Sequence, residues 1–394
     1  MREQVNLFFT IGAVVAIAVV TMVTGLYGTR TRSTSNFLVA SRTVGPRWNG
    51  AAISGEFLSA ASFLGIAGLV LKGGVDALWY PVGFTAGYLA LLLFVAAPLR
   101  RSGAYTLPDF AEERLSSAQL RKICTVFLII ICWLYLVPQL QGAGLTVATV
   151  SNSKYPQWVG AAVVMVIVTF NIYTGWMRSI TVVQAFQYWI KLTALAVPVF
   201  VLLIHHAGQG SRDLLGAAAG NNAWLLPFYS AELSGPVQSP LLATYSLVLA
   251  LMLGTMGLPH VLGRYYTNPD GLAARKTTLV VLALLGFFYL FPMISGWLAR
   301  LYVPQLVATG NTDAALLLLP VAALGGWLGQ LLAALIAAGA FAAFVAAASG
   351  LVVSVAGALS SDVLPGRLRS FKVATLAAWS VPLALAIALS SMEL

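Results

Sequence analysis

The feature that most constrains this chain is a series of long apolar runs, each close to the length that crosses a lipid bilayer. A spanning helix needs about 20 predominantly apolar residues, and ten runs of that kind follow one another. Inside lipid every backbone N–H and C=O group must be satisfied internally, so only helices and closed barrels can span. The runs are continuous rather than alternating, which predicts helices. They cover residues 7–28, 50–71, 77–99, 123–150, 157–177, 180–204, 240–263, 277–302, 327–359 and 371–391.

Composition leads to the same fold class. Hydrophobic residues make up 59% of the chain and charged residues only 9%, against roughly 25% charged in a soluble domain. The 36 glycines suit helices that pack closely in lipid. We therefore predict an all-α polytopic membrane protein with a single transmembrane domain over residues 1–394. A shorter apolar stretch, 314–324, is predicted to be a re-entrant or surface helix.

The net charge of +10 is distributed in short clusters between the apolar runs, which argues against nucleic acid as a partner. Sixteen of the 22 Lys and Arg residues lie in the linkers 29–49, 100–122, 178–179, 264–276 and 361–372. Basic loops stay on the cytoplasmic side, so we predict a multi-pass protein of the cell inner (plasma) membrane with its N-terminus outside. Ten spans would then end outside, directly after an apolar run. We expect one or more further C-terminal helices to be missing.

The second run carries polar residues that are costly in lipid and are therefore candidates for function. It contains Gly55, Glu56 and the serines Ser54, Ser59 and Ser62. Glycine and small neighbours allow the helix to open, which frees carbonyl groups that can hold a cation. The alternative is close packing by small residues, with Glu56 near the cytoplasmic interface or paired to a basic residue.

The seventh run contains Gly254, Gly257 and Pro259, which should break its hydrogen-bond ladder. Such a break in lipid is tolerated where it is buried or lines a cavity; a simple proline kink is the alternative. His260 is expected to be a hydrogen-bonded structural residue. The two broken runs stand five spans apart, so they would occupy corresponding positions in two inverted repeats, a pattern that indicates a site at the midplane of the membrane.

Other polar groups are fewer. Gln139, in the fourth run, could face a cavity or make an interhelical hydrogen bond. The two cysteines, Cys124 and Cys132, lie eight residues apart in one run, too far apart to form a disulfide with each other. The sequence has no paired acids, metal-ligand cluster or Ser/His/Asp arrangement, so we predict neither an enzyme nor a bound cofactor.

Several motifs together resemble the sodium/solute symporter family, and within it the cation/acetate symporter (acetate permease, monocarboxylate) branch. The resemblance covers essentially the whole chain. The motifs are Asn36-Phe37-Leu38-Val39-Ala40-Ser41-Arg42, Gly55-Glu56-Phe57-Leu58-Ser59-Ala60-Ala61-Ser62-Phe63-Leu64-Gly65-Ile66, Tyr105-Thr106-Leu107-Pro108-Asp109-Phe110 with Arg114, and Gly254-Thr255-Met256-Gly257-Leu258-Pro259-His260 with Arg264.

The resemblance implies a leucine-transporter-like fold. One extra N-terminal helix, 7–28, would precede inverted five-helix repeats at 50–204 and 240–391, with the last helix of the second repeat apparently missing. The family's sodium site would use the carbonyl groups of Gly55, Leu58 and Ala343. Its hydroxyl pair falls on Ala346 and Ala347, so those two ligands are absent, and Ser349 is the nearest hydroxyl. An aspartate that supports the site in the sugar branch falls on Gln184. These departures keep proton coupling, with Glu56 as the candidate group, open beside Na⁺.

The resemblance also implies a function. The chain would couple the inward flux of a cation, Na⁺ or H⁺, to uptake of a small monocarboxylate such as acetate, propionate or pyruvate by alternating access. Solute contacts are predicted at Glu56, Ser59, Ser62, Gln139, Thr255, Met256, Gly257, Leu258 and Pro259. Two alternatives stay open: a membrane sensor module of a histidine kinase, and an inactive truncated transporter fragment.

Overall fold

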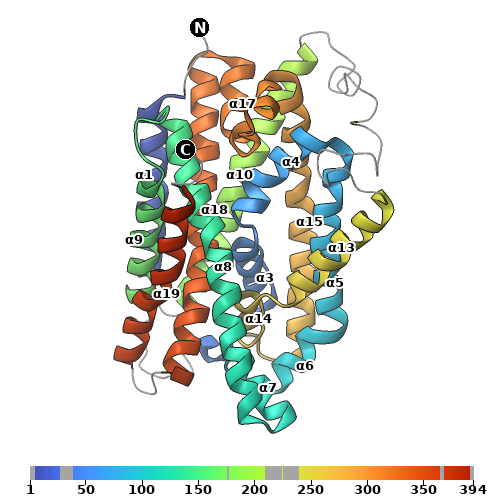
Figure 1. Ribbon diagram of the computed structural model, residues 1–394, viewed down its shortest axis with the longest axis vertical. Helices are drawn as coiled ribbons and strands as arrows, with labels where there is room; N and C mark the ends of the chain where they lie inside the picture. Colours follow the sequence, from blue (N-terminus) through green and yellow to red (C-terminus); the bar gives the residue numbers. More distant parts are fainter. Residues whose placement is uncertain are drawn as a thin grey trace.

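The computed structural model describes residues 5–26, 39–174, 177–208, 224, 239–363 and 368–390. In these ranges all regular structure is helical, and the long helices run side by side along the longest axis of the molecule (Figure 1). The first motif is therefore described only from Val39 onward, and Arg2, Arg212 and residues 391–394 lie outside the described ranges. The all-α prediction is confirmed.

Most of the predicted spans are single long helices. These are α1 (Leu7–Leu26), α8 (Ala118–Val150), α10 (Met177–Gly208), α15 (Gly271–Tyr302), α18 (Gly326–Ala358) and α19 (Leu368–Ser390). By length and apolarity, seven helices in the described ranges can cross a membrane, or eight if one bent pair is a single span. Ten were predicted. The difference arises because α9 (Trp158–Thr174) has only 17 residues, and because the predicted runs 50–71 and 77–99 share one helical series from Ala61 to Arg101.

That series turns back on itself. It consists of η2 (Ala61–Gly65), α4 (Ile66–Gly73), η3 (Gly74–Leu78), α5 (Trp79–Ala90), η4 (Leu91–Val95) and α6 (Ala96–Arg101). Gly74 caps α4 with φ +61°, a conformation that glycine adopts without the steric cost of a Cβ atom. Figure 1 shows α4 near one end of the bundle and α5 and α6 leading toward the other.

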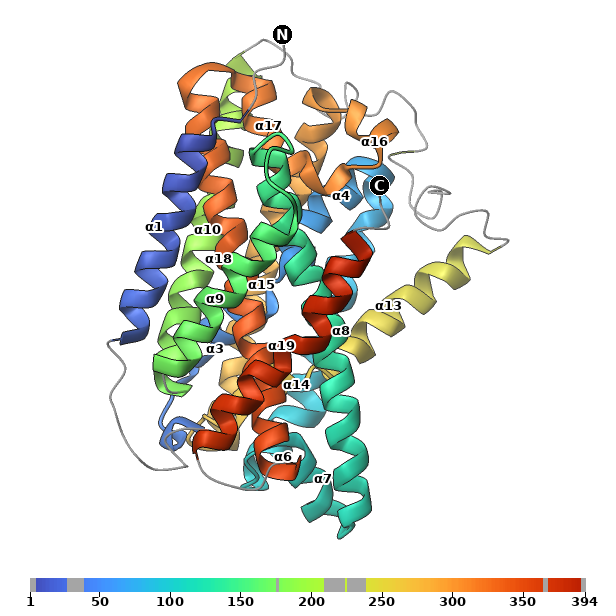
Figure 2. The same cartoon turned by 60° about the vertical axis from the view of Figure 1, so that its left-hand side comes forward.

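Two helices outside the main series of long spans are α1 and α17. The extra helix α1 packs against α18, α10 and α9 at the edge of the bundle, as Figure 2 shows. The short apolar helix α17 (Ala315–Leu324) follows α16 (Gln305–Thr309) and η6 (Thr312–Ala314). It packs on α18 and α15 with six of its ten residues buried, so it is not a surface helix.

Both predicted breaks are present. Helix α3 (Pro46–Phe57) ends at Leu58, whose ψ of 86° leaves the helical region, and helical structure resumes at Ala61. Helix α13 (Pro240–Met256) ends at Gly257, and α14 (Pro259–Tyr265) starts at a bend of 49°. Proline at the first position of α14 cannot donate the N–H that would continue α13.

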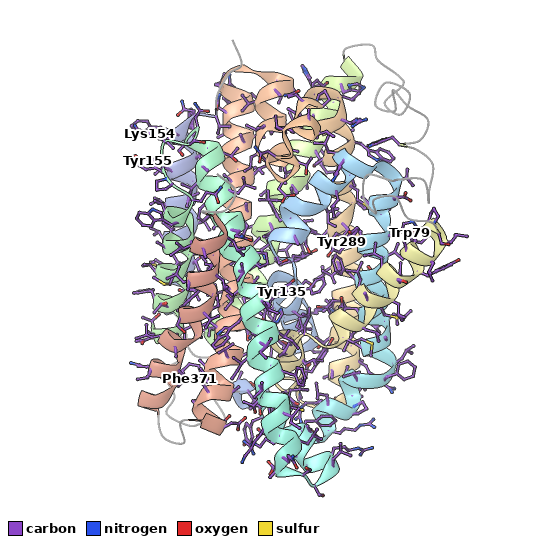
Figure 3. The ribbon with its side chains drawn as sticks, in the orientation of Figure 1. Trp79, Tyr135, Lys154, Tyr155, Tyr289 and Phe371 are labelled. Atoms are coloured by element: carbon purple, nitrogen blue, oxygen red, sulfur yellow. The ribbon has the colours of Figure 1, made fainter. Side chains whose placement is uncertain are left out.

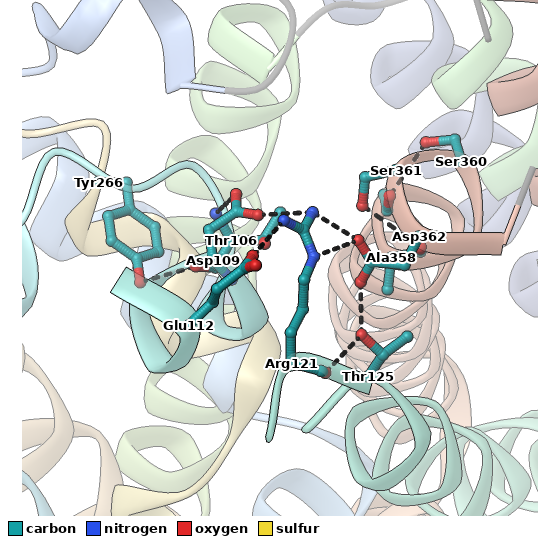
Figure 4. A network of polar contacts seen from close by, with 11 residues as sticks. Thr106, Asp109, Glu112, Arg121, Thr125, Tyr266, Ala358, Ser360, Ser361 and Asp362 are labelled. Atoms are coloured by element: carbon teal, nitrogen blue, oxygen red, sulfur yellow. Dashed lines mark hydrogen bonds and ion pairs between the residues drawn. The ribbon is translucent and has the colours of Figure 1, made fainter. Parts of the chain in front are cut away.

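The end of the bundle that carries the basic linkers is closed by polar contacts. Arg121 at the start of α8 forms ion pairs with Asp109 (2.9 Å) and Glu112 (2.7 Å) of α7 (Leu107–Leu115) and with Asp362 (2.6 Å) of η7 (Leu359–Val363) (Figure 4). The hydroxyl of Tyr266 donates to the carbonyl of Thr106 at 3.1 Å. The predicted linkers 100–122, 264–276 and 361–372 therefore meet at one end of the molecule.

Candidate solute and cation site at the two helix breaks

The inner pieces of the two broken spans, α3 and α14, contact each other, and both views place them within the bundle (Figures 1 and 2). Their link is a buried ion pair in which Arg264 Nε donates to Glu56 Oε2 at 2.6 Å. Each of the two side chains is only 1% exposed. A charge buried in the membrane persists where it is paired. Glu56 is thus paired to a basic residue, as one of the two sequence interpretations expected.

The guanidinium of Arg264 also reaches α10. It donates to the hydroxyl of Thr181 at 2.9 Å and to the side-chain oxygen of Gln184. On the other side of the carboxylate, α18 approaches so closely at Gly350 that a Cβ atom there would overlap the Glu56 carboxyl group. The ion pair therefore sits where α3, α10, α14 and α18 converge.

The carbonyl groups freed at the end of α3 have a partner. The Lys191 ammonium of α10 donates to the carbonyl oxygen of Leu58 at 2.8 Å and to that of Gly55. Lys191 is fully buried. A Cβ atom at Gly55 would overlap the carbonyl oxygen of Gln184, so glycine is what allows α10 to come this close. The predicted cation ligands Gly55 and Leu58 thus hold an internal ammonium group.

The predicted cation positions on α18 are all buried and supply few free oxygens. The carbonyl of Ala346 accepts a hydrogen bond from Gln184 Nε2 at 3.1 Å. The hydroxyl of Ser349 donates to the carbonyl of Val345 in its own helix at 2.7 Å. Ala343 and Ala347 have no side-chain oxygen. Their role as cation ligands stays a prediction.

Three predicted solute residues meet at the α3 break. Gln139 Oε1 accepts from the backbone N–H of Ala60 at 2.9 Å, so Gln139 makes the interhelical bond that was one of its two expected roles. The hydroxyl of Ser59 accepts from Tyr135 at 3.2 Å, and Ser62 shares a 3.0 Å hydrogen bond with Tyr289. Figure 3 shows the two tyrosines near the middle of the bundle.

The other predicted solute residues lie at the second break. Thr255 packs on Gly87 of α5, with its Cβ 2.5 Å from the position of a Cβ built on that glycine. Gly257 N–H donates to the carbonyl of Leu253 at 3.1 Å, which ends α13. Leu258 and Pro259 are buried at the start of α14, whereas Met256 is only partly buried. Tyr135 contacts both breaks. Its hydroxyl donates to Ser59 at the first break, and its ring centroid lies 5.5 Å from that of His260 at the second.

Several buried polar atoms around the breaks have no hydrogen-bond partner within the described ranges. They are Glu56 Oε1, Ser54 Oγ, the hydroxyl of Tyr88 and both ring nitrogens of His260. The expectation that His260 is hydrogen-bonded is therefore wrong for the described ranges, where the contact of its ring is with the ring of Tyr135. An unsatisfied buried donor or acceptor costs free energy that a bound ligand can recover.

Sequence reasoning did not assign Lys191, Tyr88, Tyr135 or Tyr289 to the site, and it took Arg264 only as part of a motif. A signal was available for Lys191, since an ionisable residue inside an apolar run is a candidate for function by default. No comparable signal marks the tyrosines, which are common in membrane helices. The formal charges of Glu56, Lys191 and Arg264 at the α3 break sum to one positive charge.

The fold, with its two interrupted spans in contact, is that of the leucine-transporter-like class of membrane proteins. A solved structure of a Na⁺-coupled sialic acid symporter, in its substrate-bound outward-open state, matches with a TM-score of 0.78 at 14% sequence identity. The match covers 97% of this chain and 81% of that one. The predicted fold class is therefore confirmed, while the repeat boundaries 50–204 and 240–391 stay predictions.

The chain belongs to the sodium:solute symporter family, whose model matches residues 37–388. It is 33% identical over 354 residues to the uncharacterized symporter YwcA of Bacillus subtilis (strain 168), covering 86% of this chain and 65% of the relative. It is 32% identical over 384 residues to a monocarboxylic acid transporter of Corynebacterium glutamicum, covering 93% of this chain and 68% of the relative. The chain thus spans about two thirds of the length of these relatives. This is a family of transporters, not of enzymes.

Proposed function

We propose that this protein is a cation-coupled symporter that carries a small monocarboxylate, such as acetate, propionate or pyruvate, into the cell by alternating access. The observation that carries the proposal is the net positive charge of the buried group Glu56, Lys191 and Arg264 at the α3 break. A carboxylate that enters the membrane interior needs a compensating positive charge. The similarity to a monocarboxylic acid transporter supports the same class of solute.

The solute pocket lies between the two breaks. Tyr88 and His260 are buried and lack partners in the described ranges, so the Tyr88 hydroxyl and an imidazole N–H are free to donate to a carboxylate. Tyr135 bridges the breaks by its hydroxyl bond to Ser59 and its ring contact with His260. Phe57 packs edge-on against the Tyr88 ring at a centroid distance of 5.0 Å, which limits the space beside that ring and favours a small solute.

The orientation of the protein in the membrane is proposed from the charge distribution. Basic loops face the cytoplasm, so the end closed by the Arg121 ion pairs is the inner end and the N-terminus lies outside. At the opposite end, a cavity of about 740 Å³ is lined by the last turns of α8 and α15 and by α17, including Thr149, Tyr302 and Leu318. We propose that the solute enters from this side.

The test is uptake of labelled acetate into vesicles that contain the purified protein, with Na⁺ and pH gradients imposed separately. At least one of the two gradients should drive accumulation above that of empty vesicles. Unlabelled propionate and pyruvate should compete, whereas acetamide, which has nearly the shape of acetate but no charge, should not. Absence of uptake under both gradients would remove the symporter proposal, and equal competition by acetamide would remove the role of the positive charge.

A further inference from the structure

The break after α3 creates a cation site in the backbone. Leu58 N–H still bonds to the Ser54 carbonyl at 3.1 Å, but beyond this residue the helix stops. The carbonyl groups of the last turn carry the negative end of the helix dipole and lack intrahelical partners. Carbonyl groups of an interrupted helix are the usual means by which membrane transporters hold a cation.

In this protein the site has an occupant from within the chain. The Lys191 ammonium donates to the Gly55 and Leu58 carbonyls. An ammonium group carries three hydrogen-bond donors and no acceptor, so two carbonyl oxygens accept from two of its three donors. The contact depends on Gly55, where a side chain would collide with α10.

Helix α18, which carries the other predicted cation positions, offers few free oxygen ligands for a metal ion. On α18 the carbonyl of Ala346 already accepts from Gln184, and the hydroxyl of Ser349 donates within its own helix. A hard cation that leaves water needs several oxygen ligands to replace its hydration shell. The alanine side chains of 343, 346 and 347 provide none.

We propose that the Lys191 ammonium is a built-in cation that takes the place of free Na⁺ at the carbonyl groups of Gly55 and Leu58. Na⁺ does not bind there, and the positive charge that holds α3 against α10 is supplied by the chain itself. The inference deepens the proposed function, since it concerns the cation of the proposed symport. Its test nevertheless reads ion binding without any solute, so it can fail or succeed independently of acetate uptake.

The experiment compares thermal unfolding of the purified protein in detergent as NaCl replaces KCl at constant ionic strength. The variants are Lys191→Ala, which frees the two carbonyl groups, and Lys154→Ala, which removes an exposed lysine as a matched control. We expect Lys191→Ala to gain a saturable, Na⁺-specific rise in Tm that the wild type and Lys154→Ala lack. A ligand that binds only the folded state raises stability in this concentration-dependent way.

Outcomes divide cleanly. A folded Lys191→Ala variant whose Na⁺ response equals that of the wild type, whether present or absent in both, overturns the proposal. A larger Na⁺ response in the variant than in the wild type supports it, even if the wild type binds Na⁺ elsewhere. If Lys191→Ala does not fold, an experimental density map of the wild type in NaCl decides. Density for the ammonium on both carbonyls supports the proposal, and an ion between them with Lys191 displaced overturns it.

Discussion

Arg264 Nε and Glu56 Oε2 lie 2.6 Å apart, almost completely buried, and this pair joins the inner pieces of the two interrupted spans. The residues are separated by 208 positions in the chain. Each charge is the main counter-charge of the other. The pair therefore stabilises the folded protein only while α3 and α14 keep their relative position. A movement that separates α3 from α14 pulls the two charges apart, and each charge then has to find another partner or water. A movement that shifts α3 and α14 as one unit keeps the pair.

Removing one member of this pair should be more damaging than removing both. Glu56→Gln leaves Arg264 buried without its counter-charge, which costs about 3–5 kcal/mol for a buried pair. The double variant Glu56→Gln/Arg264→Gln removes both charges of the pair and should recover part of the loss. Thermal unfolding of the four proteins of this cycle measures the coupling. Glu113→Gln, at an exposed site, is the control, and additive effects would contradict the pairing.

Gly350 should tolerate no side chain. A methyl group there would overlap the Glu56 carboxyl group, so Gly350→Ala should displace the carboxylate from Arg264 and destabilise the protein by about 1–3 kcal/mol, as overpacking does. Gly357→Ala on the same helix meets nothing within 4 Å and should be neutral or slightly stabilising, because alanine favours a helix. Tm values that are equal for the two variants would show that α18 yields at Gly350.

The hydroxyl of Tyr88 should contribute to solute affinity and little to folding. It is buried and has no hydrogen-bond partner within the described ranges, so Tyr88→Phe removes a donor that the protein itself does not use there. A hydrogen bond to a charged group is worth about 1.5–3 kcal/mol, which predicts a rise in the KM for acetate of about 10- to 140-fold. Tm should stay within the range of the exposed control Tyr245→Phe. An unchanged KM would place the carboxylate elsewhere.

The contacts at the basic end should hold that end closed. Asp362→Asn removes one of the three carboxylates around Arg121 and weakens the bond from the Thr125 hydroxyl. Arg121 keeps Asp109 and Glu112, so the fold should survive with a loss of about 1 kcal/mol, typical of a partly exposed pair. Amide hydrogen exchange in η7, which carries Asp362, should become faster while exchange in α9, at a distance from the contact, stays unchanged. Equal protection of η7 in both proteins would argue against a closing role.

How much could be predicted differs between backbone and side chains. The two interruptions were predictable because Gly257 and Pro259 break hydrogen bonds locally, and because small and polar residues gather around Leu58. The number of spans was harder, since α9 is short and α4 to α6 form one series whose reversal at Gly74 depends on a single residue. Gln139 makes the interhelical hydrogen bond that was one of its two expected roles, but the sequence alone did not decide between them.

The sequence by itself determined that the chain forms apolar helices in lipid and where two of them are interrupted. Both properties follow from local physics: the transfer of apolar side chains and the hydrogen bonds of the backbone. Only the tertiary structure decided that Arg264 neutralises Glu56 and that Lys191 reaches carbonyl groups more than a hundred positions away. Charge pairing in the membrane depends on which helices lie together, and that arrangement results from packing summed over the whole bundle. The cation at the α3 break was therefore decided by helix packing around Gly55, beyond the reach of any local pattern.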